Sequence, residues 1–276
     1  MSEGEAWARE LLAELRAQRY RPHAWLRFLA HSFERARANR QKRRYEHRQG
    51  LLLGAAGVAA WAAVASIHPW LALAGALWWT LVIVMLDWHL GMLEDEHGRP
   101  LSGLGSPNLL ALGRAGIVPV LPVASPALLA VLVIGAGISD VVDGPLARRR
   151  SEETRLGVWL DGAADTLVVS AAAVGAARHG LLPWWAGWLV LARQAAPWLL
   201  VSAAYFIRGE APPLRRAVSG KAAGVLVFAG LLLGALRLPG AVPFVVVGAI
   251  GGLATLLVTL VRAQAVRARL SLPPPA

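Results

Sequence analysis

From about residue 50 onward, the chain alternates long apolar stretches with short polar connections. Apolar runs cover about residues 51–67, 70–90, 107–119, 125–147, 156–177, 182–207, 222–236 and 242–261. Several of them approach or exceed the roughly 18 residues that a helix needs to cross the hydrocarbon core of a bilayer. The pattern therefore predicts an all-α, polytopic membrane protein with about eight transmembrane helices.

The first 49 residues follow another pattern. Residues 5–16 place apolar side chains at helical spacing with Glu and Arg opposite, which predicts an amphipathic helix. Pro22 interrupts it, and an arginine-rich helix is expected to follow, through Arg44. Two interpretations stay open for this arm. It is either a surface helix bound to anionic lipid or to a partner subunit, or a solvated basic arm that fixes orientation.

Composition agrees with a membrane protein. Of the 276 residues, 56% are hydrophobic and only 16% are charged, which excludes an ordinary soluble domain. The absence of cysteine excludes disulfides and cysteine-ligated metal sites. The net charge of +11 could indicate nucleic acid, but the arginines gather beside apolar segments. Anionic lipid headgroups and the positive-inside rule explain that distribution better, so no nucleic-acid partner is expected.

Four carboxylates lie within or beside apolar sequence. Asp140 and Asp143 share one helix face, and so do Asp161 and Asp165. The basic run 148–155 joins the two segments, so the helices can form a hairpin in which both pairs converge. Converging carboxylates repel one another, and divalent ions would neutralise them. All-oxygen ligands suit Mg²⁺ or Mn²⁺, and two such ions can hold a phosphoryl or pyrophosphate group.

At these residues the pattern Asp-x2-Asp-Gly-x2-Ala-Arg-x8-Gly-x3-Asp-x3-Asp resembles the signature of the CDP-alcohol phosphatidyltransferases. The alternative, interfacial aspartates paired with nearby arginines, explains one or two carboxylates but not four with both glycines. The resemblance implies a six-helix core over residues 107–262 and a homodimer. It also implies transfer of a phosphatidyl group from CDP-diacylglycerol to an acceptor alcohol, with release of CMP.

The resemblance also implies roles for individual residues. The metal ligands would be Asp140, Asp143, Asp161 and Asp165, with Asp165 also serving as the general base. The residues expected to bind the cytidine diphosphate are Asn108, Arg114, Asp140, Gly144, Ala147, Arg148 and Gly157. Residues 107–114 resemble the start of the family's first core helix, although Ala111 stands where Thr or Ser is usual. On physical grounds alone, Asn108 fits a helix cap better than a ligand contact.

A second basic set is expected to bind the acceptor, namely Arg193, Arg215, Arg216 and Lys221. Residues 191–194 and 219–221 are similar to phosphatidylglycerophosphate synthases, which makes glycerol 3-phosphate the best guess. Gln194 and Gly224 depart from that subgroup, which often has Glu and Thr there. Inositol phosphate, serine or a second lipid remain alternatives, and positive-inside topology explains Arg215 and Arg216 equally well.

The polar segments on the aspartate side carry most of the arginines, whereas the opposite side holds little more than His68, Arg178, His179 and Arg237. The aspartates should therefore open to the cytoplasm from a multi-pass position in the inner membrane. Asp87 and His89 fit an interfacial position better than a catalytic pair. The expected organisation is a basic cytoplasmic arm (1–49), an added helix pair (50–92), a loop (93–106), the core (107–262) and a cytoplasmic tail (263–276).

Two other classes of protein would also use an acidic membrane site. A prenyl-type transferase binds pyrophosphate through Mg²⁺, but it gives no reason for the Gly144, Ala147 and Arg148 element. A divalent-cation transporter would use the same carboxylates without a nucleotide. Release of CMP separates the expected enzyme from both.

Overall fold

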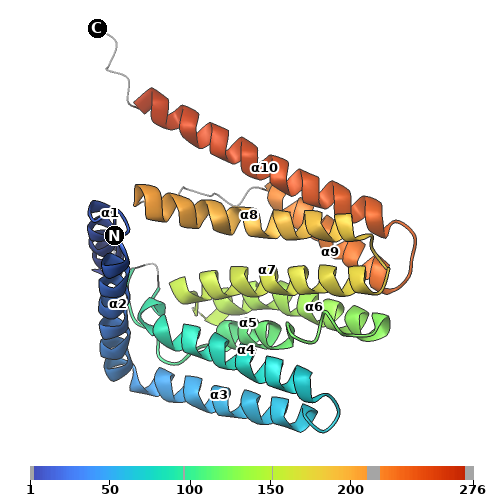
Figure 1. Cartoon of the computed structure of the whole chain (residues 1–276), viewed down its shortest axis with the longest axis horizontal. Coiled ribbons are helices and arrows are strands. Elements are labelled where there is room, and N and C mark those ends of the chain that lie inside the picture. The colour runs from blue at the N-terminus through green and yellow to red at the C-terminus, as the bar shows by residue number, and fades with distance from the viewer. Residues whose placement is uncertain (1–2, 96, 151, 210–217, 271–276) are drawn as a thin grey trace. The chain divides into compact units, whose positions relative to one another are not determined.

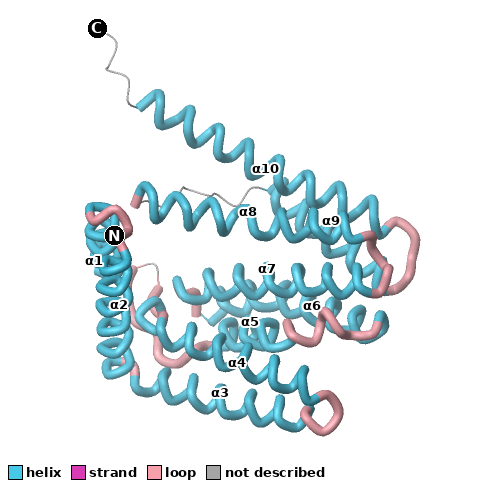
Figure 2. The backbone as a smooth tube through the Cα atoms, viewed as in Figure 1, coloured by secondary structure: helices cyan, strands magenta, loops and turns pink. Residues whose placement is uncertain are grey.

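The structure is a computed structural model that describes residues 3–95, 97–150, 152–209 and 218–270. Within these ranges the chain is helical and has no strand, apart from an isolated bridge between Glu94 and Pro100 (Figure 2). This confirms the all-α prediction. The elements are α1 (Glu3–Ala17), α2 (Pro22–Lys42), α3 (Arg44–Val64), α4 (Pro69–Trp88), the 3-10 helix η1 (Leu90–Met92), α5 (Ser106–Ile117), α6 (Pro126–Arg150), α7 (Arg155–Arg178), α8 (Trp184–Arg208), α9 (Val218–Ala235) and α10 (Ala241–Leu270).

Five helices in the described part of the chain are long and apolar enough to cross a membrane, namely α4, α6, α7, α8 and α10. The other three expected spans exist as helices but fall short of that length or composition. α5 has 12 residues, and the apolar part of α9, Ser219–Ala235, is also short. α3 begins in the polar chain at Arg44, so only its later part, from Leu51 to Val64, is continuously apolar. Of the eight membrane-crossing helices expected, five in the described part of the chain are therefore supported.

The chain divides into two compact units, which are described separately. The first comprises residues 1–124 and 134–171, and the second comprises residues 125–133 and 172–276. All four signature aspartates belong to the first unit. Arg193 and Lys221 belong to the second.

In the first unit, α3 and α4 form a hairpin with reciprocal contacts between glycine and tryptophan. The Trp79 ring lies over Gly57, where a Cβ atom would be 2.0 Å from Nε1. The Trp61 ring lies over Gly75, where a Cβ atom would be 2.2 Å from Cδ2. Both rings are buried, and Trp79 Nε1 donates a hydrogen bond to the Leu53 carbonyl at 3.0 Å. The missing side chains let the two helices approach closely enough to bury both indoles.

The hairpin also supports α5 and the loop that precedes it. Trp78 Nε1 donates to the Ala115 carbonyl at 2.8 Å. The loop that precedes α5 is held by two side chains of α3. The Glu46 carboxylate accepts the Gly103 N–H at 3.0 Å, and the Gln49 amide oxygen accepts the Leu104 N–H at 2.9 Å. These bonds satisfy backbone donors that would otherwise be orphaned in a loop.

The basic arm packs on its own chain. In α1, Leu12 and Leu15 are buried, as the amphipathic pattern predicts. α2 lies across the end of α4 (Figure 1), where Arg40 forms an ion pair with Asp87 at 2.5 Å. His47 Nδ1 contacts the other oxygen of Asp87 at 2.6 Å. The C-terminal half of α2 is therefore docked on α4 of its own chain, a contact that the sequence pattern does not indicate.

In the second unit, α9 and α10 pack against each other through glycine. A Cβ atom on Gly230 would lie 2.7 Å from the Val245 side chain, and one on Gly248 would lie 2.7 Å from the Ala223 carbonyl. α8 packs against α10 in the same unit. This close packing brings the glycine-bearing faces of α9 and α10 near Arg193 of α8.

Candidate carboxylate site for a divalent metal

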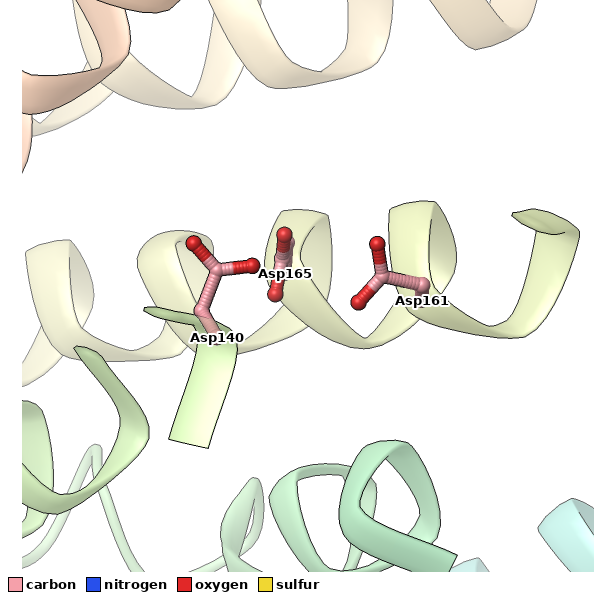
Figure 3. A group of neighbouring side chains, drawn as sticks. All are labelled: Asp140, Asp161 and Asp165. Carbon is pink, nitrogen blue, oxygen red and sulfur yellow. The ribbon is translucent and has the colours of Figure 1, made fainter. Parts of the chain in front are cut away.

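Three of the four signature aspartates bring carboxylate oxygens together (Figure 3). One oxygen each from Asp140 of α6 and from Asp161 and Asp165 of α7 lie within 4.8 Å of one another. Hard divalent cations prefer such all-oxygen sets, and nothing but carboxylates contributes to this group. The donor chemistry therefore fits Mg²⁺ or Mn²⁺.

The local sequence between α6 and α7 sets this arrangement. Thr154 caps α7, because its Oγ1 accepts the Gly157 N–H at 2.9 Å. The cap fixes the start of α7 at Arg155, and Asp161 and Asp165 follow on successive turns of one face. On the other side of the connection, the Glu152 N–H donates to the Ala147 carbonyl at 3.0 Å and closes the end of α6.

Asp143 is not one of the three clustered carboxylates, and it pairs with Arg114 of α5. Arg114 is only 3% exposed, and its Nη1 atom lies 2.6 Å from Asp143 Oδ2 and 3.1 Å from Ser139 Oγ. The same guanidinium reaches both aspartates of α7. Its Nη2 atom bonds Asp161, and its Nε atom lies 3.2 Å from Asp165 Oδ1. Arg114 therefore joins α5, α6 and α7 at the site.

The charges of this cluster do not cancel. Four carboxylates and one guanidinium sum to −3 when all are ionised. A buried guanidinium offsets part of the repulsion among carboxylates that have been removed from water. The remaining negative charge still favours a divalent cation beside Asp140, Asp161 and Asp165.

The other residues expected at the nucleotide site lie around this cluster. Asn108 is 2% exposed, and its Nδ2 atom donates to the Leu104 carbonyl at 2.6 Å. Its Oδ1 atom occupies the space beside Gly157, where a Cβ atom would be 2.8 Å away. Near the end of α6, the exposed Arg148 side chain reaches back to Gly144, with Nη1 3.5 Å from the position of a Cβ atom there. Ala147 is half-buried beside them.

The residues expected to bind the acceptor are only partly described. Arg215 and Arg216 lie outside the described residues. Lys221 is exposed in the first turns of α9. Arg193 lies between α9 and α10, because Gly224 and Gly252 leave room for it: Cβ atoms there would be 3.4 Å from its Nη2 and 2.4 Å from its Nε. Its Nη1 donates to Gln194 at 2.8 Å, whereas its buried Nε has no acceptor in the described part of the chain.

Sequence reasoning missed three supporting residues. Ser139 lies one residue before Asp140, and its hydroxyl meets Arg114. Glu152 accepts both the Ser106 N–H at 2.9 Å and the Ser106 hydroxyl at 2.8 Å, which ties the start of α5 to the connection after α6. Thr154, three residues before Gly157, is a helix-cap signal that the sequence does contain. The Ser139 and Glu152 contacts span 25 and 46 residues, so no local pattern indicates them.

Apolar helices long enough for a bilayer, with a carboxylate cluster between two of them, define an integral membrane protein with a candidate metal site. The model of the CDP-alcohol phosphatidyltransferase family matches residues 104–268, which is more than half of the chain. The chain belongs to this family.

Curated relatives agree with the family. The chain is 36% identical over 128 residues to a cardiolipin synthase (CMP-forming) of Streptomyces coelicolor, covering 42% of this chain and 58% of the relative. It is 31% identical over 94 residues to a putative cardiolipin synthase of Mycobacterium tuberculosis, covering 32% and 45%. It is 36% identical over 86 residues to a CDP-diacylglycerol--glycerol-3-phosphate 3-phosphatidyltransferase of Pectobacterium atrosepticum, covering 29% and 47%. The chain spans about half the length of these relatives, and no solved structure matches it.

Proposed function

We propose that this protein transfers a phosphatidyl group from CDP-diacylglycerol to the hydroxyl of an acceptor alcohol and releases CMP. The observation that carries this proposal is the group of oxygens from Asp140, Asp161 and Asp165, set on two helices within the matched family region. The new bond joins the acceptor oxygen to the β-phosphorus. The bond from that phosphorus to the oxygen bridging it to the CMP phosphorus breaks, and the hydroxyl proton goes to a carboxylate.

The four signature aspartates would hold two divalent cations, Mg²⁺ or Mn²⁺. When bound, these ions would neutralise charge on the pyrophosphate of the donor. Arg148 would add a guanidinium fork for phosphate oxygens, and Gly144 and Ala147 would leave room for the nucleotide. In this proposal Asn108, Arg114 and Gly157 shape the pocket from α5 and α7, since their contacts join those helices beside the cluster.

Asp165 is the proposed general base. Its side chain is 39% exposed, compared with 28% for Asp161 and 10% for Asp143. A general base must reach the proton that it removes, and Asp165 is accessible enough for that role, as is the exposed Asp140.

For the acceptor, glycerol 3-phosphate remains our first candidate. Its phosphate would suit Arg193, whose buried Nε has no acceptor within the described residues. A buried donor without a partner is costly, and a bound anion would satisfy it. Arg215, Arg216 and Lys221 would complete the basic set. The relative named CDP-diacylglycerol--glycerol-3-phosphate 3-phosphatidyltransferase supports this candidate.

A lipid acceptor is the second candidate. Of the three relatives described above, the one that matches the largest share of this chain is named cardiolipin synthase. Cardiolipin contains two phosphatidyl groups joined by glycerol, so the same transfer would use phosphatidylglycerol as the acceptor. Inositol phosphate and serine would be tested beside it.

The test uses the purified full chain with CDP-diacylglycerol, Mg²⁺ or Mn²⁺, and each acceptor in turn, with CMP and the lipid product measured. We expect CMP release that depends on both the metal and one acceptor. Release of pyrophosphate from a prenyl diphosphate would instead indicate a prenyl-type transferase. Metal uptake into sealed vesicles without nucleotide would indicate a transporter.

We also propose that the protein lies in the inner membrane as a homodimer, with the aspartates open to the cytoplasm. The excess of arginine on the aspartate side supports this orientation. The dimer follows from the family resemblance, and the mass of the detergent-solubilised protein tests it.

A further inference from the structure

Helix α2 carries an apolar stripe that its own chain covers only in part. Leu26, Leu29 and Phe33 are 68%, 50% and 46% exposed. Their spacing of three and four residues puts them on one side of the helix. Three large apolar side chains exposed in a row on one helix are unfavourable in water and indicate a binding surface.

The contacts of α2 show which way this stripe faces. Phe33 packs against Trp88 at the end of α4, with ring centroids 5.8 Å apart, and Arg40, seven residues later on the same side, pairs with Asp87. The other side of α2 faces α1, where Ala24 is buried and Arg35 lies over the Trp7 ring at 4.6 Å. The stripe therefore lies on the side of α2 that faces α4.

Leu29 and Leu26 lie beyond the part of α2 that contacts α4. At 1.5 Å per residue they are about 6 Å and 10 Å farther along the helix than Phe33. α4 is one of the candidate membrane spans, and α2 runs across its end (Figure 1). The leucines therefore lie on α2 beyond its contact with the end of this candidate span, and no side chain of α4 covers them as Trp88 covers Phe33.

The charge of α2 indicates the chemistry of that lipid. The helix contains five basic residues and one acid, namely Arg27, Arg35, Arg37, Arg40 and Lys42 against Glu34. Arg37 and Lys42 are exposed. Basic side chains beside an apolar stripe are typical of helices that lie in the headgroup region of anionic membranes.

We propose that α2 is an interfacial helix that inserts Leu26 and Leu29 among the acyl chains next to α4 and binds anionic lipid headgroups through Arg37 and Lys42, since Arg27, Arg35 and Arg40 contact Glu14, Trp7 and Asp87 of the chain. This would hold the N-terminal arm flat on the bilayer. The proposal is independent of the reaction that the aspartates carry out.

The chain has no cysteine, so single-cysteine variants of the full protein can carry a fluorescent label at chosen positions. Leu29→Cys places the label on the stripe. Ala38→Cys is the matched control, because Ala38 is exposed and its position nine residues later turns it to the opposite side of α2. Both variants are reconstituted in phosphatidylcholine vesicles, with and without phosphatidylglycerol, that contain lipids with a quencher on the acyl chain.

We expect the label at Leu29 to be quenched several-fold more strongly than the label at Ala38, with a larger difference when phosphatidylglycerol is present. In a double variant with Arg37→Gln, the enhancement by phosphatidylglycerol should fall by about fivefold, since one basic residue near an anionic surface contributes about 1 kcal/mol. Equal quenching at both positions would overturn the proposal. So would a label at Leu29 that is shielded from lipid and shows energy transfer between donor-labelled and acceptor-labelled copies, which would indicate a second copy on this face. If Leu29→Cys fails to fold, Leu26→Cys gives the same comparison.

Discussion

Arg114 contacts both aspartate pairs, which makes it the residue on which the metal-free site depends. Its guanidinium touches Asp143, Asp161 and Asp165 while it is almost fully buried. Removing one partner of a buried ion pair leaves an uncompensated charge and costs about 3 kcal/mol or more. The side chain therefore acts as an internal counterion for the acids around it.

We expect Arg114→Ala to lower the thermal midpoint of the protein in a metal chelator. Mg²⁺ should raise that midpoint more in the variant than in the wild type, because the ion then supplies positive charge that the side chain no longer provides. Thermal unfolding of the purified chain, with chelator and with Mg²⁺, measures both effects. Arg114→Lys keeps the charge without the planar fork, so its thermal midpoint should lie between those of the wild type and of Arg114→Ala. A chelated variant as stable as the wild type would contradict this role.

Asp165→Asn should leave metal and nucleotide binding largely intact while CMP release falls by about two or more orders of magnitude, the usual contribution of a general base. The amide keeps the shape of the side chain but cannot take up the proton. Binding of a CDP-lipid and CMP release, measured on the same preparation, separate the two effects. Turnover at the wild-type rate would show that another group is the base.

Asp143→Ala should abolish Mg²⁺-dependent binding of a CDP-lipid. The variant removes one of the four acids, and it also leaves the buried Arg114 without its contact at 2.6 Å. Titration of the CDP-lipid with Mg²⁺ and with chelator measures the loss. Retained metal-dependent affinity would limit Asp143 to a structural ion pair with Arg114.

Among the helices, the α3–α4 hairpin shows how small residues determine packing. Gly75→Ala would place a methyl group 2.2 Å from the Trp61 ring, so one of the two helices must shift. Overpacking of this kind costs about 1 to 3 kcal/mol. We expect a lower thermal midpoint and, because Trp78 and Trp79 of α4 contact α5, lower transfer activity.

Gly135→Ala is the matched control for this substitution, because a Cβ atom there meets nothing within 4 Å. A change from glycine to alanine in an open helical position is neutral or stabilising by up to about 1 kcal/mol. Equal loss of stability in both variants would show that the contact between Trp61 and Gly75 is not what holds the hairpin together.

Local patterns predicted the helices and the spacing of the aspartates, because both depend on periodicity within one segment. Asp140, Asp161 and Asp165 converge because the two helix faces meet in a hairpin, as expected. The contacts of Arg114 could not be predicted in this way, since they join residues 29 to 51 positions apart. The start of α3 at Arg44 was missed for a similar reason. Its polar first turns are stabilised by contacts of Glu46 and Gln49 with a distant loop, and not by an apolar face.

For the molecule as a whole, the orientation of the helices can be tested by labelling. We expect a cysteine at Glu153, between α6 and α7, to react only with reagents on the cytoplasmic side, and one at His179, between α7 and α8, only from the opposite side. Both positions are exposed in short connections. Labelling of intact and permeabilised cells with an impermeant maleimide measures this, and the cysteine-free parent chain is the control. Labelling of both positions from one side would contradict the predicted topology.

The two hydrogen bonds from α3 to the loop before α5 have a consequence for the order in which the protein folds during synthesis. A ribosome releases the N-terminal part first, and early segments generally fold before later ones. The α3–α4 hairpin, with Glu46 and Gln49 already presented, therefore leaves the ribosome before Arg114 and any of the four acids. It can serve as a template on which α5 docks, so that the guanidinium is in place when the first aspartate enters the bilayer.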